Sequence, residues 1–271
     1  MAMEKGGEIK VSENKVALCW LGQAGFFLKT PGGRGILIDP YFSDLVNRLF
    51  EGSHGQAYRR MLPMCFDPED FGADILLSSH EHPDHLDIDS IPGMLKKDGF
   101  RGYVNRPSLD ELEENGIPVE NFSVLNKGDV IAFEDFTMTV VDCDHGDGCP
   151  DALGFYLDFG FLTVYFSGDT GLNTGRLKTV IDRGADIALL PINGAYGNLS
   201  AKEAAELSAM LHAKVCVPCH FWMFPEHDTA FGGPLDAIKI FPGEAPECQL
   251  FLAMPGEYIY IDDASNITKN R

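Results

Sequence analysis

Short apolar stretches recur along the chain and predict a protein rich in β-strands. Runs of this length, enriched in β-branched and aromatic residues and bounded by turn-forming residues, are typical of strands. The expected strands are 16–20, 25–28, 35–39, 74–78, 136–143, 154–158, 162–168, 187–191, 214–218, 249–253 and 258–261. Glycine-rich turns at Gly32-Gly33 and Gly146–Gly148 are expected to close hairpins or redirect the chain between them.

Helical patterns lie between some of these strands. Ser108–Glu111 and Ser200–Glu203 both have the Ser-x-x-Glu form of a capping box, which satisfies free N–H groups at a helix start. The second opens an amphipathic helix with Ala204, Leu207 and Leu211 on its apolar side, and His212 is expected to belong to it. Antiparallel-looking strand batches followed by helices predict an α+β fold, a four-layer αββα sandwich.

The length of 271 residues fits one compact domain, so residues 1–271 are expected to form a single domain. Segment 41–70 differs from the rest because it mixes aromatic, basic and sulfur-containing residues without a clean period. We interpret this segment as a partly helical excursion that acts as a lid.

Charge and cysteine usage exclude several classes of protein. The chain has 41 acidic and 21 basic residues, a net charge of −20, which argues against a nucleic-acid surface but leaves a small anionic substrate open. No apolar run approaches the roughly 20 residues that cross a bilayer, so a soluble cytoplasmic protein without a membrane partner is expected. Seven scattered cysteines fit reduced thiols. The CxxC pair Cys216 and Cys219 is interpreted as buried thiols, with redox or zinc use as the alternative.

The strongest chemical signal is the sequence His-Glu-His-Pro-Asp-His at 80–85, directly after the apolar run 75–77. Imidazole and carboxylate groups together suit borderline divalent cations, and this density can supply two adjacent metals. His80 and His82, two residues apart, can share one cation, whereas Asp84 and His85 can face a second one beyond Pro83. The motif therefore predicts a binuclear metal enzyme, and a polar surface loop is the alternative.

Two metals need further ligands, and three acids or histidines follow predicted strands elsewhere. His145 follows strand 136–143, Asp169 follows strand 162–168, and His220 follows strand 214–218. A lone histidine in such a place is usually structural, but the joint pattern favours ligands. His54, His212 and His227 lack this placement.

Together these residues resemble the metal site of the metallo-β-lactamase superfamily. Flanking motifs at 20–26, 36–41, 191–194, 197–200 and 218–224 are similar to those of the group that contains L-ascorbate-6-phosphate lactonase. The resemblance implies that His80, His82 and His145 bind one metal, that Asp84, His85 and His220 bind the other, and that Asp169 bridges them.

The resemblance also implies that Asp39 orients a ligand histidine, although a turn acid before Pro40 is an equal interpretation. Zinc, manganese and iron are all compatible with such ligands, and metal identity stays open. Relatives are expected to have a longer insertion after Asn193-Gly194, whereas here 195–197 lead almost directly to the helix, which leaves the substrate open.

The implied activity is hydrolysis of a small sugar lactone, phosphorylated or not, by water activated between the two metals, with Asp84 able to carry the proton to the leaving oxygen. A binuclear phosphodiesterase is the alternative, and a non-catalytic metal-binding scaffold is a third hypothesis. The candidate substrate contacts are Arg59, Arg60, Asn193, Tyr196 and Trp222. Oligomeric state is not readable from the sequence.

Overall fold

A computed structural model describes residues 6–51, 58–63, 67–225 and 233–269. The chain divides into two compact units, each built on one sheet. Unit 1 comprises Met1–Leu125 and Met254–Arg271, and unit 2 comprises Asn126–Ala253. The single domain over 1–271 and the lid over 41–70 stay predictions, and part of that segment lies outside the described residues.

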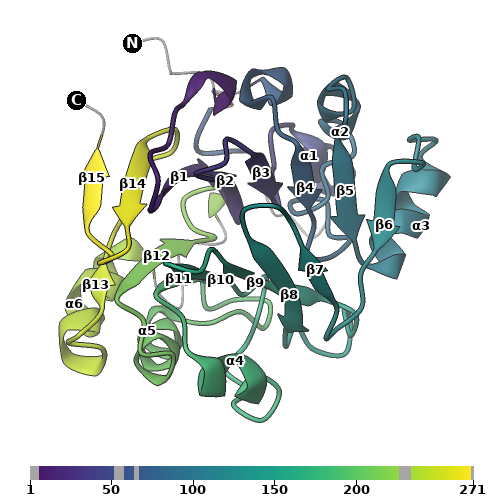
Figure 1. The fold of residues 1–271 in the computed structure, drawn as a ribbon. Coiled ribbons are helices and arrows are strands. Elements are labelled where there is room, and N and C mark those ends of the chain that lie inside the picture. The colour runs from purple at the N-terminus through teal and green to yellow at the C-terminus, as the bar shows by residue number, and fades with distance from the viewer. Residues whose placement is uncertain (1–5, 52–57, 64–66, 226–232, 270–271) are drawn as a thin grey trace. The chain divides into compact units, whose positions relative to one another are not determined.

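Unit 1 contains an eight-stranded mixed sheet, seen in Figure 1 as a row from the yellow strands to the teal ones. In sheet order its strands are β15 (Ile267–Lys269), β14 (Tyr258–Asp262), β1 (Lys15–Gly22), β2 (Gly25–Lys29), β3 (Gly35–Ile38), β4 (Ile75–Leu77), β5 (Arg101–Val104) and β6 (Phe122–Val124). Neighbours pair antiparallel from β15 to β3 and parallel from β3 to β6. The parallel part brings the carboxyl ends of β3 and β4 to the same edge.

Unit 1 has five short helical segments among its described residues, and three of them contribute side chains to the core cluster. The five segments are the 3-10 turns η1 (Gly6–Glu8) and η2 (Pro68–Phe71) and the helices α1 (Leu45–Phe50), α2 (Ile91–Met94) and α3 (Arg106–Glu114). A core cluster joins Phe27, Leu37 and Leu76 of the strands to Met94 of α2 and Leu112 of α3. This packing stabilises β4 through Leu76, because burial of a large apolar side chain contributes about 1.5–3 kcal/mol.

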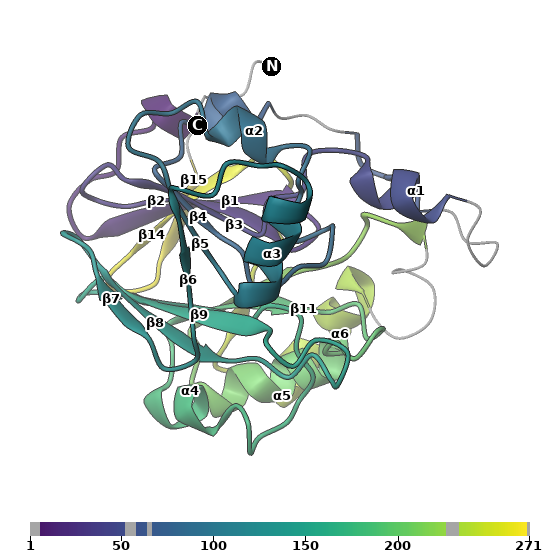
Figure 2. The ribbon, with the colours of Figure 1, turned by 90° about the vertical axis from the view of Figure 1, so that its right-hand side faces the viewer.

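Unit 2 contains a seven-stranded mixed sheet with three helices on one face, as Figure 2 shows. In sheet order its strands are β13 (Gln249–Leu250), β12 (Val215–Cys219), β11 (Ile187–Pro191), β10 (Thr163–Phe166), β9 (Leu153–Asp158), β8 (Thr137–Asp142) and β7 (Val130–Ala132), and the helices are α4 (Lys178–Arg183), α5 (Ala201–Met210) and α6 (Pro234–Glu244). Pairing is antiparallel from β7 to β10 and parallel from β10 to β13.

The expected antiparallel arrangement is therefore wrong for about half of each sheet. A helix such as α5 between β11 and β12 returns the chain to the starting end, which makes the two strands parallel. Four strands were not predicted: β5, β6, β7 and β15. They are three or four residues long and are not fully buried, so their apolar pattern is weak.

One of the two predicted capping boxes is confirmed and the other is wrong. Ser200 caps α5, with both reciprocal bonds to Glu203 present. Helix α3 instead begins three residues earlier than expected, because the Asn105 side chain accepts the Ser108 backbone N–H at 2.9 Å. His212 lies beyond the end of α5, at φ 51, and not within the helix.

The described helices contain no segment with both the length and the hydropathy that a bilayer-spanning helix needs.

Candidate metal centre

The ligand loop of unit 1 begins where β4 ends, as the sequence predicts. It is a series of turns rather than an extended stretch, since the N–H groups of His85 and Leu86 both donate to the His82 carbonyl, at 2.9 and 2.8 Å. His80 and His85 are buried. Asp39 follows the neighbouring strand β3 and reaches this loop from the same sheet edge.

His80 and His82 converge on one point. Nε2 of His80 lies 2.9 Å from Nδ1 of His82, and the rings meet edge to face. On its other side, Nδ1 of His80 lies 2.9 Å from the Ser79 hydroxyl. A partner on the second ring nitrogen fixes the orientation and basicity of a ligand histidine. The two nitrogens are close to each other, and the prediction that these histidines share a cation stays a prediction.

Asp39 supports both buried histidines of this loop. Its Oδ2 lies 2.7 Å from Nδ1 of His85, and it also accepts the Ser79 hydroxyl, which in turn contacts His80. Its Oδ1 accepts the Ser79 backbone N–H at 2.7 Å. Burial raises the pKa of Asp39, and the hydrogen bonds from His85 and Ser79 act in the opposite direction. These contacts favour the orienting role of Asp39 over the turn-acid interpretation, since its carboxylate holds side chains 40 and 46 residues away.

Asp84 lies next to His85 and is held by a residue from another strand. Its Oδ2 is 3.7 Å from Nε2 of His85 and accepts the side-chain N–H of Gln23 at 2.7 Å. Two ligand atoms 3.7 Å apart fit one cation, because metal–ligand bonds to nitrogen and oxygen are about 2.0–2.2 Å long. Gln23 and Ser79 were not predicted as site residues. Both stand inside or beside the quoted motifs, at 20–26 and 80–85.

Unit 2 holds the remaining predicted ligands, each within three residues of the end of a strand. His145 follows β8, Asp169 follows β10 and His220 follows β12, and all three are buried. Oδ2 of Asp169 lies 3.1 Å from Nε2 of His220 and 4.0 Å from Nε2 of His145. Oδ2 of Asp169 is thus near both histidines, and its role as a bridging ligand stays a prediction.

Backbone contacts connect the ligand-bearing loops of unit 2. The N–H of Asp144 donates to the Thr170 hydroxyl at 3.0 Å, and the N–H of Gly171 donates to the Asp144 carbonyl at 2.9 Å. The Cys143 thiol contacts the Asp169 carbonyl at 2.9 Å. These bonds tie the chain next to His145 to the chain at and next to Asp169.

The donor sets suit divalent metals. Among the candidate ligands, unit 1 contains three imidazoles and the carboxylate of Asp84, and unit 2 contains two imidazoles and the carboxylate of Asp169. Within unit 1, ring and carboxylate atoms of Asp39, His80 and His85 also lie close enough to one another to hold an ion. Mixed nitrogen and oxygen ligands accept zinc, manganese or iron. The division of the seven ligands between two metals stays a prediction.

Backbone strain gathers around these residues. Eight described residues other than glycine have positive φ, and five of them are Gln23, Asp39, Tyr196, His220 and Trp222, with φ between 43 and 62. Such conformations cost of order 1 kcal/mol or more each and persist where the surroundings impose them, often at functional sites. The strain therefore points to the same two clusters as the ligands do.

The predicted substrate contacts fall into two groups. Arg59 is exposed, whereas Arg60 donates from Nη1 to the carbonyls of Tyr41 and Ser43, at 3.0 and 2.9 Å, and stacks over the Tyr41 ring. Burial lowers the pKa of Arg60. Arg60 thus braces the start of segment 41–70, and a substrate role for either arginine stays a prediction.

The other three contacts lie in unit 2 after β11 and β12. Asn193 is buried and forms a backbone bridge with Ser200, whereas Tyr196 and Trp222 are exposed by 56% and 37%. Phe224, the aromatic residue two positions after Trp222, is buried. Their part in substrate binding also stays a prediction.

The other histidines and the CxxC pair are described by the structure only in part. His54 and His227 lie outside the described residues. Cys216 and Cys219 are buried on β12, and burial raises the pKa of Cys216, which agrees with inert thiols.

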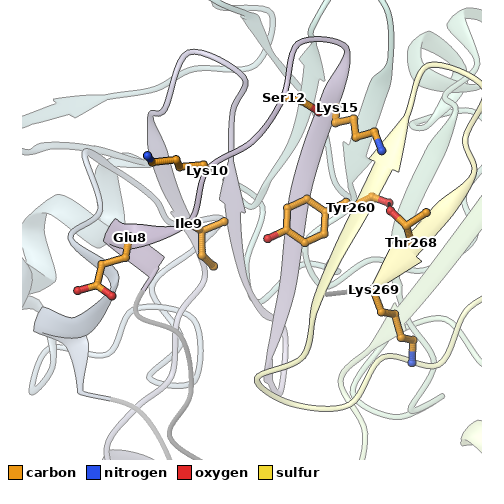
Figure 3. A pocket seen from close by; sticks show the side chains of 8 residues that line it. All are labelled: Glu8, Ile9, Lys10, Ser12, Lys15, Tyr260, Thr268 and Lys269. Carbon is orange, nitrogen blue, oxygen red and sulfur yellow. Dashed lines mark hydrogen bonds between the residues drawn. The ribbon is translucent and has the colours of Figure 1, made fainter. Parts of the chain in front are cut away.

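A hollow of about 530 Å³ in unit 1 contains none of the ligands. Figure 3 shows its lining: Glu8, Ile9, Lys10, Ser12, Lys15, Tyr260, Thr268 and Lys269. Lys10 points away from Tyr260, and Lys269 pairs with Glu257 at 2.7 Å. The positive groups do not converge on one point, so this hollow lacks the features of an anion site.

Comparisons with known proteins identify the family. The model of the β-lactamase superfamily domain matches residues 17–220. A UPF0173 metal-dependent hydrolase of Rubrobacter xylanophilus is 31% identical over 250 residues, covering 84% of this chain and 94% of the relative.

Two solved structures share the fold. They are Igni18, a metallo hydrolase of Ignicoccus hospitalis (TM-score 0.70, 21% identity, 92% of this chain and 99% of that one), and an isothiocyanate hydrolase from Delia radicum gut bacteria (TM-score 0.73, 20% identity, 89% and 97%). The prediction of an α+β fold with two sheets and flanking helices is confirmed. The chain belongs to the metallo-β-lactamase superfamily, within its UPF0173 family of metal-dependent hydrolases.

Proposed function

We propose that the enzyme hydrolyses a small, hydroxyl-rich cyclic ester of the ascorbate-phosphate lactone type with two divalent cations, held by the predicted ligands His80, His82, Asp84, His85, His145, Asp169 and His220. The observation that carries the metal site is the convergence of donor atoms inside each cluster, 2.9 Å between His80 and His82 and 3.1 Å between Asp169 and His220. Membership in a family of metal-dependent hydrolases supports metal binding by these residues.

When bound, the cations supply a water molecule of lowered pKa and stabilise the charge that develops on the attacked carbonyl oxygen. In the reaction the water oxygen adds to the acyl carbon, the ring C–O bond breaks, and a proton passes to the leaving oxygen. Asp84 is the group that would deliver this proton. Asp39 keeps His85 in one tautomer through the contact with Nδ1, which leaves Nε2 for the metal.

Two buried amides support a substrate with hydroxyl groups. Asn193 and Asn198 are exposed by only 1% and 6%, and no polar side-chain atom of either has a hydrogen-bond partner among the described residues. An unpaired buried amide costs about 1–3 kcal/mol, so a polar ligand that pairs with it after a change of rotamer gains this energy. A neutral amide both donates and accepts, which matches a sugar hydroxyl better than a phosphate does.

The loop that carries these amides is tied to the ligand loops of unit 2. The N–H of Leu199 donates to the Thr170 carbonyl at 2.8 Å, next to Asp169, and the N–H of Ile192 donates to the Cys219 carbonyl at 3.1 Å, next to His220. A Cβ added to Gly171 would lie 3.0 Å from the Gly197 carbonyl, which shows how closely the loops approach. The amides are therefore held close to the chain segments of two ligands.

Substrate profiling tests the proposed reaction. The protein, loaded in turn with Zn²⁺, Mn²⁺ and Fe²⁺, is given a sugar lactone, L-ascorbate 6-phosphate, bis(p-nitrophenyl) phosphate and an alkyl isothiocyanate, the last because of the name of one fold relative. We expect hydrolysis of a lactone. Cleavage of the phosphodiester alone would make the enzyme a phosphodiesterase, and no turnover at any loading would leave a metal-binding scaffold. Either result would contradict the proposal.

Metal stoichiometry tests the joint site separately from the substrate. We expect about two ions per chain in gently purified protein, measured by mass spectrometry of the metals. His82→Ala in unit 1 and Asp169→Asn in unit 2 should each reduce loading and abolish turnover. Glu120→Gln, an exposed acid, is the control. Full metal loading in both ligand variants would contradict the proposed two-metal site.

A further inference from the structure

The turn between β1 and β2 has an unusual residue at its tip. Gln23 is fully buried, follows Gly22 at φ 93 and itself has a φ of 50. This left-handed conformation favours glycine, and for glutamine it costs of order 1 kcal/mol. The pairing of β1 with β2 is irregular at the same place, between Trp20 and Gly22. The backbone preference of this position therefore does not account for a glutamine.

The backbone carbonyl and the side-chain amide of Gln23 both form hydrogen bonds. Its backbone carbonyl accepts the indole N–H of Trp20 at 2.9 Å, and Trp20 is buried in β1. Its side-chain Nε2 donates to Oδ2 of Asp84 at 2.7 Å. The indole fixes the turn, and the turn aims the amide at the carboxylate, 61 residues away in sequence.

This arrangement matches the one that supports His85. Asp39, at φ 43, contacts Nδ1 of His85, and Gln23, at φ 50, contacts Oδ2 of Asp84. The chain next to Gln23 also passes close to Asp39, because a Cβ on Gly25 would lie 3.1 Å from the Asp39 carbonyl. Two adjacent residues of the ligand loop are thus each held by a buried residue in a strained conformation.

We infer that Gln23 is a positioning residue that fixes Asp84 as a metal ligand and proton carrier. Its amide N–H holds Oδ2 of Asp84 at 3.7 Å from Nε2 of His85, a separation that fits one shared cation. A bond to a charged acceptor is stronger than one between neutral groups, and it restricts the carboxylate to one rotamer. This role rests on the metal site proposed above.

The test replaces the donor while keeping the shape. Gln23→Met removes the N–H at nearly constant volume, and Gln23→Glu places an acceptor beside the carboxylate. Gln249→Met, at an exposed position of β13, is the matched control. For each protein, Zn²⁺ affinity is measured by competition with a chromophoric chelator, folding by circular dichroism, and kcat and KM on the best substrate.

We expect both Gln23 variants to fold and to bind one of the two Zn²⁺ ions about 10- to 100-fold more weakly, the usual effect of removing a support of a metal ligand. The other ion should keep its affinity, and kcat should fall with little change in KM. Unchanged binding of both ions in Gln23→Met would overturn the inference and leave the metal site intact. Wild-type protein that binds no Zn²⁺, Mn²⁺ or Fe²⁺ would instead overturn the proposed function, and this inference with it.

Discussion

At the scale of single residues, the site depends on side chains that hold ligands as much as on the ligands. Asp39 reaches His85 directly and His80 through Ser79, and Gln23 reaches Asp84. Each support is buried, so its bonds are poorly replaced by water. The ligand types were readable from the motif, whereas the supports became visible only from distances.

Asp39→Asn tests this arrangement at the residue scale. The amide keeps the shape but loses the charge that favours an N–H on Nδ1 of His85, so metal affinity should fall about 10- to 100-fold. Chelator competition measures this change. Asp263→Asn, an exposed acid of the same unit, should leave the affinity unchanged. Equal affinities for wild type and Asp39→Asn would show that Asp39 is only a turn acid.

At the scale of elements, strand ends and helix starts determine where the chemistry lies. The predicted ligands follow the carboxyl ends of β4, β8, β10 and β12. Such ends can carry strained loops, because the strands beneath are held by ladder bonds and by buried apolar side chains. The start of α3 shows how sequence patterns mislead at this scale, since both Asn105 and Ser108 have a capping side chain and only Asn105 uses it.

A pair of substitutions tests the α3 cap. Asn105→Ala removes the acceptor for the Ser108 N–H and should lower the free energy of unfolding by about 1 kcal/mol. Ser108→Ala removes a buried hydroxyl that has no hydrogen-bond partner among the described residues, so stability should stay the same or rise. Urea unfolding followed by circular dichroism measures both. A larger loss of stability in Ser108→Ala than in Asn105→Ala would show that Ser108 is the cap.

At the scale of the whole molecule, the fold buries reactive groups that the reaction does not need. The six described cysteines are free and buried, and burial raises the pKa of Cys248 to about 11. Burial likewise raises the pKa of Cys19, Cys143 and Cys216. The thiolate is the reactive form. These thiols are therefore protected twice, because burial keeps reagents away from them and the raised pKa keeps them protonated.

Thiol labelling tests this protection. In a Cys65→Ser variant, which removes the one cysteine outside the described residues, we expect labelling by a disulfide reagent at pH 7.5 to be slow for the native protein. In guanidinium chloride, the six remaining thiols should react rapidly. Fast labelling of one or more thiols in the native state would show an exposed, reactive cysteine and would reopen the redox interpretation of Cys216 and Cys219.

The sequence alone determined the superfamily, the candidate ligands and most of the strands. Metal ligands must be particular side chains at particular spacings, as in 80–85, and buried strands must be apolar, so both leave a local record. Tertiary structure decided which strands run parallel, which residue caps α3, and that Gln23 and Asp39 hold Asp84 and His85. The strand pairings and the contacts of Gln23 and Asp39 join residues distant in sequence, which leave no pattern along the chain, whereas at α3 two capping side chains three residues apart compete and the sequence does not rank them.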